Sequence, residues 1–307
     1  MKITTYNPDH EASLLDLERR SPQGKLVQLV MSRTRFLSRA IVFDAFEAFV
    51  AEEEGQLVGT AIGGKVPLIH NGVMHWAGYG FDVKVSPTHR GRKIAQRLAR
   101  HIVENFFLNH DLTRQFITLK KSNHPVVALT ANVIKKMSLV EFVYLTIPTA
   151  SQLGPHKGFR NDQKFSVSLL SGQELLRDHY VIAEKNLSYW LLDKTYKLRI
   201  EKIHPIVKVL MALYSKVSRL AKYVPREGST ISSAILFNHN ATNMDKLNNV
   251  LGQLVERQID YLLVCCRRGD DVYRWLSHYS INTYGYYLLF NYEVKKQDSI
   301  TIDVRCL

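Results

Sequence analysis

The residues with the clearest chemical potential lie in a short basic loop, residues 89–95, between an apolar strand and an amphipathic helix. The strand is predicted to end at Val85, because Pro87 prevents its continuation. The first amide groups of a helix have no backbone partners and carry part of the helix dipole, so they attract anions. Gly91 allows the backbone to approach an oxygen atom without a Cβ in the way. The loop is therefore a candidate phosphate site, and the alternative is a basic helix start that binds nothing.

The elements that must position this loop predict a mixed α/β domain over residues 1–150. The spacing of apolar residues gives the order β-α-α-β-β-β-α-β-α-β, with the loop between the fourth strand and the third helix. The predicted strands are 2–6, 48–54, 57–66, 76–85, 115–120 and 141–147, and the predicted helices are 11–20, 26–37, 90–107 and 124–137.

A stretch rich in Pro, Gly and Ser, residues 148–155, separates this domain from a second one that we place at residues 156–307. The loop at 238–242 contains neither glycine nor arginine. We therefore expect the second domain to hold no pyrophosphate and to shape an acceptor cleft instead. Its predicted elements are a strand at 165–170, a helix at 172–185, a basic helix at 200–223 and a β-α-β-α-β run over 231–294. The basic helix is expected to pack on its own domain, with a membrane-surface role as the alternative.

Composition excludes several classes of protein. The chain has 307 residues, which suits two domains, and its 46% apolar content is ordinary for a globular protein. No apolar run approaches the ~18 residues of a membrane span, and the first residues do not form a signal peptide. Cys265 and Cys266 are adjacent in a predicted strand, so they should face opposite sides. Without metal spacing or a disulfide framework, we expect no metal, reduced thiols and a cytoplasmic location.

The net charge of +13 is spread over both halves, without a basic tail. A basic surface favours anionic partners such as coenzyme A, nucleic acid or anionic membrane, and the alternative is a solvated surface with no such role. The basic residues do not alternate with aromatic residues in an RNA-binding pattern, so nucleic acid is an unlikely partner. We expect no membrane partner and a monomer or homodimer.

The strand and loop resemble the acyl-CoA loop of the GNAT superfamily of N-acetyltransferases, in which Val-x-Pro leads into Arg/Gln-x-x-Gly-x-Gly/Ala. Arg90 takes the first place of this motif and Ala95 the last, while Lys93 stands where the middle glycine is usual. Lysine at that place is expected to need a negative φ. The resemblance implies a GNAT fold, acetyl-CoA as co-substrate, and a pyrophosphate held by Arg90, Gly91, Arg92, Lys93, Ile94 and Ala95.

The same resemblance implies a place for the rest of the cofactor. Val83 and Val85 would run beside the pantetheine arm, with the Val85 amide at the thioester carbonyl, and the strand at 117–120 would separate to make room. Asn123 matches an asparagine that supports the pantetheine side, although it would also serve as a helix N-cap. Val133 stands where the family often has a tyrosine that protonates the leaving thiolate, which leaves the general acid unassigned.

Residues 19–26 and 77–87 are similar to segments of the HOOKLESS-type N-acetyltransferases and their bacterial relatives, which also carry a C-terminal half. This narrows the resemblance to a branch of the superfamily with a tandem arrangement.

Direct acyl transfer needs a neutral amine, although an alkyl ammonium has a pKa near 10. Many family members place a glutamate six residues before the Val85 position, where this chain has Tyr79. Tyr79 is our first candidate for an acid or positioning role. His75 shares its strand face and titrates near neutrality, whereas Asp82 is expected on the opposite face. A structural role is the alternative for all three.

The sequence therefore predicts an acetyl-CoA-dependent N-acetyltransferase that acts on a primary amine, with one working domain and one degenerate partner domain. The alternative is a catalytically impaired protein of the same fold that binds CoA or a protein as a regulator.

Overall fold

The computed structural model describes residues 1–307 except 25, 124–136, 155–163, 185–186, 210–225 and 240–243. Its first half contains β1 (Lys2–Thr5), α1 (Glu11–Arg19), β2 (Val27–Ser32), β3 (Ala45–Glu53), β4 (Gln56–His70), β5 (Val73–Val85), α2 (Ile94–Ile102), β6 (Gln115–Lys120) and β7 (Ser138–Pro148). The second half contains β8 (Phe165–Ser168), β9 (Tyr180–Glu184), β10 (Leu187–Leu191), β11 (Lys197–Ile203), β12 (Thr230–Ile231), β13 (Ser233–Phe237), α5 (Met244–Glu256), β14 (Tyr261–Cys266), α6 (Asp271–Leu276), β15 (Asn282–Phe290) and β16 (Ile300–Asp303).

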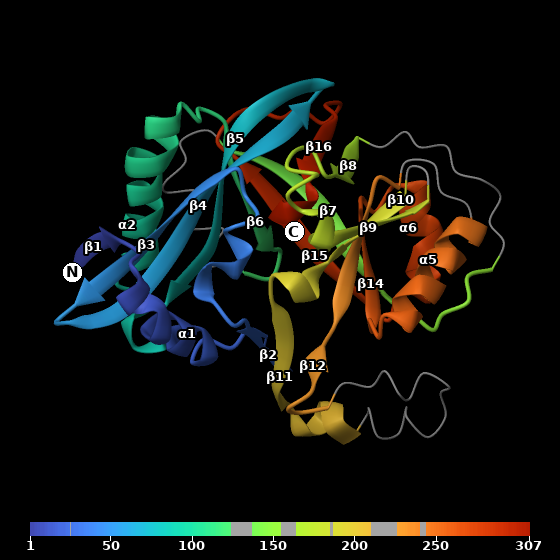
Figure 1. The fold of residues 1–307 in the computed structure, drawn as a ribbon, viewed down its shortest axis with the longest axis horizontal. Coiled ribbons are helices and arrows are strands. Elements are labelled where there is room, and N and C mark those ends of the chain that lie inside the picture. Colours follow the sequence, from blue (N-terminus) through green and yellow to red (C-terminus); the bar gives the residue numbers. More distant parts are fainter. Residues whose placement is uncertain (25, 124–136, 155–163, 185–186, 210–225, 240–243) are drawn as a thin grey trace.

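One large sheet runs through both halves (Figure 1). Among the described residues it has 13 strands, eleven of them in the order β1-β3-β4-β5-β6-β15-β7-β14-β13-β10-β9, while β16 pairs with β4 and β8. Neighbours are antiparallel except at β5–β6, β13–β14 and β16–β8, which are parallel. A smaller sheet joins β2 of the first half to β11 and β12 of the second.

The halves interlock at the centre of the large sheet. β15 of the second half lies between β6 and β7, so β7 of the first half lies against β14. On either side of the central β15–β7 pair, one parallel strand pair is connected through a helix: β5 and β6 through α2, and β13 and β14 through α5. The two halves thus have related layouts and exchange a strand within one mixed α/β sheet, and the degenerate character of the second half stays a prediction.

Three apolar clusters hold the fold together. α2 presents Ile94, Leu98 and Ile102 to one face of β3 and β4. The helix lies close because β4 has Gly63 there, where a Cβ would come within 2.8 Å of Ile102 Cγ2. The opposite face packs against α1 and the last residues of the chain, and the third cluster lies under α5 and α6. Helices therefore cover both faces of the sheet (Figure 1).

The two adjacent cysteines lie as predicted. Cys265 belongs to the cluster shared by both halves, and Cys266 points to the cluster under α5. Both thiols, and that of Cys306, are free and buried.

Several predicted helices are wrong. The segment predicted as a helix at 26–37 contains β2, which pairs with β11 of the other half. The segment predicted as a helix at 172–185 contains β9, and the predicted basic helix at 200–223 begins as β11. β2 and β11 pair with each other across the two halves, and β9 pairs with the neighbouring strand β10, so strand pairing outweighs a local pattern that also suits a helix. Residues 205–209 are helical, and residues 210–225 lie outside the described part.

Candidate active site

The central feature of the site is a gap between two parallel strands. β5 and β6 pair only from Gly78 to Gly80 of β5, opposite Gln115 to Ile117 of β6. Beyond this point β5 continues to Val85 with β4 as its partner, and β6 continues toward β15. The expected separation of these strands is therefore confirmed, and we refer to the opening beyond Gly80 and Ile117 as the splay.

A β-bulge lies in the part of β5 that borders the splay. Thr60 of β4 pairs with Lys84 and Ile62 with Phe81, so two residues of β5 lie opposite one residue of β4. Asp82 in the bulge has φ +50°. The bulge reverses the alternation of side chains, which corrects the prediction that Asp82 faces away from Tyr79: one Arg39 guanidinium contacts both side chains.

The predicted phosphate loop follows β5 directly. After a 3₁₀ turn at Pro87–His89, Gly91 has φ +81° and Lys93 has φ +60°. The expectation of a negative φ at Lys93 is therefore wrong, because this lysine takes the left-handed conformation that favours glycine. The predicted helix begins at Ile94 rather than at residue 90, and a π-turn at Val103–Phe107 follows it.

The start of α2 leaves backbone amides available. Its first helical hydrogen bond runs from Arg97 N to Lys93 O, and no side chain caps the helix. The amides from Lys93 onward through the first turn therefore have no helical partner. A Cβ built on Gly91 meets nothing within 4 Å, so the space beside this backbone is open. The loop is an anion cradle of the kind the sequence predicts.

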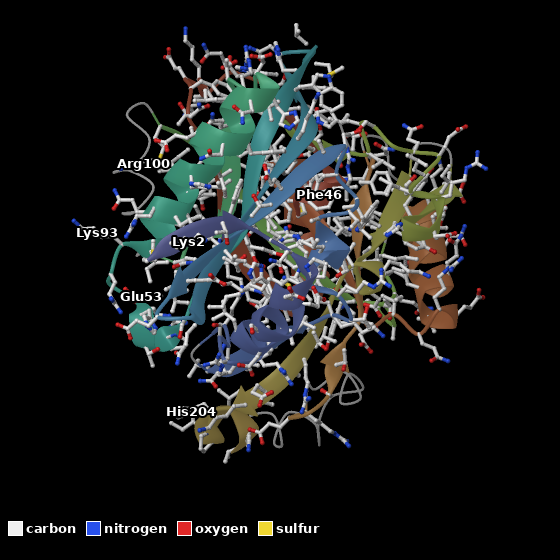
Figure 2. The ribbon with its side chains drawn as sticks, turned by 60° about the vertical axis from the view of Figure 1, so that its left-hand side comes forward. Lys2, Phe46, Glu53, Lys93, Arg100 and His204 are labelled. Carbon is white, nitrogen blue, oxygen red and sulfur yellow. The ribbon has the colours of Figure 1, made fainter. Side chains whose placement is uncertain are left out.

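The side chains of the loop divide into three groups. Arg90 and Lys93 are exposed, and Figure 2 shows Lys93 pointing away from the ribbon on the same flank as Glu53. Arg92 donates to Glu53 Oε1 at 2.8 Å, so it is partly neutralised. Ile94 is buried in the core under α2, and Ala95 is half-buried. Only the backbone of these last two residues faces the cradle.

The backbone of β5 also offers an amide to the splay. Ser86 N donates to Val58 O of β4 at 2.8 Å. Because successive backbone N–H groups of a strand point to opposite edges, the Val85 N–H points to the splay edge. Val83 is an exposed residue of the bulge, and Val85 packs partly against the core under α2.

Tyr79 lies where β5 and β6 part, and its side chain is buried. Its hydroxyl donates to Cys306 O at 2.6 Å and accepts from Arg39 Nη2 at 3.3 Å. Burial raises the pKa of Tyr79 to about 12 and outweighs the nearby Arg39 cation, which lowers it. Tyr79 therefore stays a neutral phenol near pH 7, which can donate or orient a proton but cannot take one.

The structure does not bring His75 to Tyr79. His75 pairs with Leu68 near the far end of the β4–β5 hairpin, four residues or about 13 Å along the strand. Its pKa is lowered, first by burial and then by the nearby charge of Arg114.

Asn123 lies at the end of the turn after β6 and is exposed, with its backbone N–H donating to Lys120 O at 2.9 Å. The predicted helix after it, with Ala128, Val133 and Lys136, lies outside the described residues. The role of Asn123 toward pantetheine stays a prediction.

A buried network of charged side chains beside the splay was not predicted. Asp82 accepts from Arg33 and Arg39, and Arg33 also donates to Glu18 on α1. Lys84 of β5 forms an ion pair with the same Glu18 carboxylate. Burial lowers the pKa of Lys84 to about 7. The sequence contains one weak signal for this network. Glu18 lies next to Leu17 in α1, where the other buried side chains are apolar.

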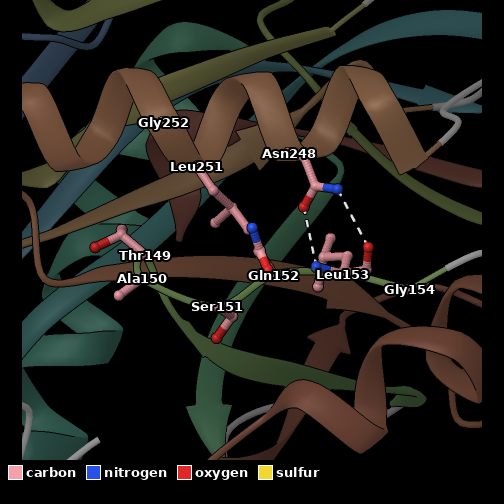
Figure 3. A pocket seen from close by; sticks show the side chains of 9 residues that line it. All are labelled: Thr149, Ala150, Ser151, Gln152, Leu153, Gly154, Asn248, Leu251 and Gly252. Carbon is pink, nitrogen blue, oxygen red and sulfur yellow. Dashed lines mark hydrogen bonds between the residues drawn. The ribbon is translucent and has the colours of Figure 1, made fainter. Parts of the chain in front are cut away.

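A separate pocket of about 590 Å³ lies in the second half, between the chain at residues 149–154 and α5 (Figure 3). Asn248 of α5 bridges both backbone groups of Leu153, accepting from its N–H at 3.0 Å and donating to its carbonyl at 3.2 Å. The pocket is remote from the splay in the sheet order, because β15, β7 and β14 lie between.

In the described part of the chain, no group of three or more His, Cys, Asp or Glu side chains is arranged to hold a metal ion. Among the same residues, no helix combines the length and apolar character needed to cross a membrane.

A strand that leaves its parallel neighbour, followed by an uncapped helix start, is the arrangement that the resemblance described above implies. Residues 13–132 match the family model of the acetyltransferase (GNAT) family. The match covers less than half of the chain, and the family it names is the one that the loop motif predicts. A search of curated proteins finds no significant match, so the similarity to HOOKLESS-type enzymes stays a prediction.

Several solved structures are similar to this chain, and one of them has a TM-score above 0.5. N-myristoyltransferase of Saccharomyces cerevisiae with bound myristoyl-CoA matches with a TM-score of 0.54 and 9% identity, over 96% of this chain and 83% of that one. A tandem GNAT protein from the clavulanic acid biosynthesis pathway matches with a TM-score of 0.49 and 11% identity, over 96% and 99%. The ribosomal-protein-S18-alanine N-acetyltransferase of Escherichia coli matches with a TM-score of 0.34 and 12% identity, over 46% and 79%.

Proposed function

We propose that this protein is an N-acetyltransferase that moves an acetyl group from acetyl-CoA to a primary amine by direct transfer. The acceptor is a small-molecule or protein amine. The observation that carries the proposal is the splay itself, which lies directly before the uncapped start of α2. One opening can therefore take the pantetheine arm along β5 while the helix start takes the pyrophosphate.

The residues present fit such a co-substrate. Gly91 leaves open space beside the loop backbone, and Arg90 and Lys93 supply exposed positive charge. The Val85 N–H on the splay edge supplies a donor for a thioester carbonyl, which polarises it for attack. The amine nitrogen then forms the new C–N bond and releases one proton, the C–S bond breaks, and the thiolate takes up one proton, so the proton count balances. We assign Tyr79 to donating or orienting that proton, because its raised pKa keeps it protonated.

The test is calorimetric titration with acetyl-CoA, followed by thiol release with a panel of amines. We expect micromolar binding and thiol release that depends on the amine. If acetyl-CoA does not bind, the proposal is wrong, because the splay and the helix start would then serve no cofactor. A panel that includes amino acids, polyamines and peptides with free N-termini assigns the acceptor class.

A second function is favoured by one observation. Tyr79 occupies the place of the usual glutamate base, and its hydroxyl already donates a hydrogen bond to Cys306 O. A protein of this kind would bind CoA or a partner protein as a regulator without catalysing transfer. Acetyl-CoA binding with no thiol release for any amine would favour this function.

The oligomeric state, the location and the partners are also proposals. We propose a monomer or homodimer in the cytoplasm that does not engage membrane or nucleic acid. Nucleic-acid binding that weakens steeply between low and moderate salt would contradict this.

A further inference from the structure

The bulge of β5 is held by two arginines from a different part of the first half. Arg33 Nη1 donates to Asp82 Oδ2 and Arg39 Nη1 donates to Asp82 Oδ1, both at 2.8 Å. The side chains of Arg33 and Asp82 are 1% and 3% exposed. We call this arrangement the arginine clamp. Both oxygens of one carboxylate are thus held by two cations that solvent barely reaches.

Each arginine of the clamp is itself anchored. Arg33 donates through Nε to Glu18 Oε2 at 2.8 Å, and its guanidinium lies 4.5 Å from the centre of the Phe36 ring. Arg39 reaches the Tyr79 hydroxyl and, at 3.4 Å, the Leu307 carbonyl. The clamp therefore ties the bulge to α1 on one side and to the last residues of the chain on the other.

The bulge needs such a device. Asp82 has φ +50°, a conformation that costs free energy for any residue other than glycine and persists only where its surroundings over-determine it. The bulge also lies in the segment of β5 that no longer pairs with β6, so among the described residues no strand pairs with it on that edge. Two charge-assisted contacts to the side chain supply the missing restraint.

We infer that Arg33 and Arg39 are positioning residues for acyl transfer: by clamping Asp82 they fix the bulge that directs the Val85 amide into the splay. This inference rests on the proposed function, because it concerns the same acyl-CoA site. Neither arginine touches the reacting atoms. They act through Asp82, whose carboxylate stays ionised because the two guanidinium groups outweigh the effect of burial and lower its pKa.

A positioning role and a merely structural role predict different kinetics. The phosphate loop begins beyond Val85, and its amides belong to α2, which packs on β4 rather than on the clamp. Loss of the clamp should therefore change what happens at the thioester and leave the pyrophosphate end unaffected. A general loss of folding would affect both ends together.

The test compares two ligands in the full chain. Adenosine 3′-phosphate 5′-diphosphate carries the phosphates of coenzyme A without pantetheine, and acetyl-CoA carries both. For Arg39→Met, we expect unchanged affinity for the first ligand and a turnover of acetyl-CoA lower by about 100-fold, the usual effect of an ångström-scale misplacement. Arg39→Lys keeps the charge without the fork that bridges two partners, so its turnover should lie between those of Arg39→Met and the wild type.

Asp82→Asn provides a second route if Arg39→Met does not fold. Asparagine tolerates the left-handed φ but lacks the negative charge, so it should reproduce the kinetic split. The matched control is Asp298→Ala, which removes the carboxylate bonded to His70 and Asn71 at the far end of the hairpin. We expect this control to change thermal stability. Both the affinity for adenosine 3′-phosphate 5′-diphosphate and the turnover of acetyl-CoA should stay at their wild-type values.

Hydrogen exchange separates failure of this inference from failure of the proposed function. A peptide that covers residues 79–86 should exchange faster in Arg39→Met than in wild type, whether or not acetyl-CoA is a substrate. The positioning role would be overturned by unchanged hydrogen exchange in this peptide or by unchanged turnover in a folded variant. It would also be overturned if affinity for adenosine 3′-phosphate 5′-diphosphate fell as much as turnover of acetyl-CoA. Wild-type protein that binds neither ligand overturns the proposed function, and with it the assignment of the clamp to acyl transfer.

Discussion

The two halves of the molecule contain the same strand–helix–strand unit, but the parallel strands of the two units pair over different parts of their length. In the first half β5 and β6 pair over three residues, and β5 then runs on to Val85 without β6. In the second half β13 and β14 stay paired from Ser233 to Leu236, which is all but the last residue of β13. The first half thus has a gap at its parallel pair, and the second half has a closed sheet.

The loops after these strands differ in the same sense. Arg90 and Lys93 of the first loop are exposed, whereas His239 of the second loop is 2% exposed. A shared topology therefore does not make a shared site. The two halves differ in the unpaired length of one strand and in the exposure of the polar side chains of the loop that follows it.

The largest effect is expected from a change in the first loop. Gly91→Val places a branched side chain at φ +81°, beside the amides of α2. We expect acetyl-CoA affinity to fall about 100-fold, which corresponds to about 3 kcal/mol, or one to two charge-assisted hydrogen bonds. Calorimetric titration measures this directly.

The chain offers a matched control for this strain. Gly72 in the β4–β5 turn has φ +78° and, like Gly91, nothing within 4 Å of a built Cβ. Gly72→Val should lower stability by a similar amount and leave the affinity for acetyl-CoA unchanged. If Gly91→Val and Gly72→Val bind acetyl-CoA with equal affinity, the loop at Gly91 is not part of the binding site. The proposed difference between the two halves would then be wrong.

A smaller effect is expected from Tyr79→Phe, at the point where β5 and β6 part. We expect turnover to fall about tenfold to 100-fold, because a positioned proton donor is lost, with acetyl-CoA affinity nearly intact. Since the pKa of Tyr79 is raised to about 12, its protonation should add no inflection to the rate profile between pH 6 and 10.

The control for Tyr79 is a buried tyrosine of the second half. Tyr189 is fully buried, with its hydroxyl 3.4 Å from Gln253 Oε1. Tyr189→Phe should lower thermal stability and keep wild-type turnover. A wild-type rate in Tyr79→Phe would remove Tyr79 from the mechanism and favour the regulator.

The second loop allows a prediction about pH. Burial lowers the pKa of His239 to about 4 in the folded state, against 6.5 for an ordinary histidine. Between these values the unfolded chain binds a proton that the folded chain does not, so stability is fully present above pH 6.5 and falls as the pH drops toward 4. Wild type minus His239→Gln should show a slope of about 1.4 kcal/mol per pH unit in that window. A flat difference in denaturant titrations would mean that the pKa of His239 is the same in the folded and unfolded chains, so that burial does not exclude the proton.

Much of the fold could be predicted because it depends on local patterns. The strand at 115–120 was predicted to the residue, since a short segment with aromatic and β-branched residues between turn signals is typical of a strand. β2 was predicted as a helix because the residues that decide its conformation lie in β11 of the other half. Local spacing carries no information about a partner so distant.

The residues of the site also divide into those that a local motif predicts and those that depend on distant contacts. Gly91 and the helix start could be predicted because a phosphate cradle is a local motif. The face of Asp82 could not, because one bulge reverses side-chain alternation without a sequence signal. Arg33 and Arg39 could not be predicted either, since their roles depend on Asp82 and Glu18, which other elements bring to them.

The smallest effect is expected at Lys93, where the first loop departs from its family motif. A lysine at φ +60° is strained relative to glycine, so Lys93→Gly should stabilise the protein by about 1 kcal/mol and raise Tm by about 2 °C. Lys93→Ala removes the same charge but keeps the Cβ, and it should give no gain. If both variants gain equally, repulsion among the basic residues and not backbone strain is relieved. If only the glycine variant gains, the loop holds its shape against the preference of its own residue, which is expected of a backbone cradle fixed by α2 and β5.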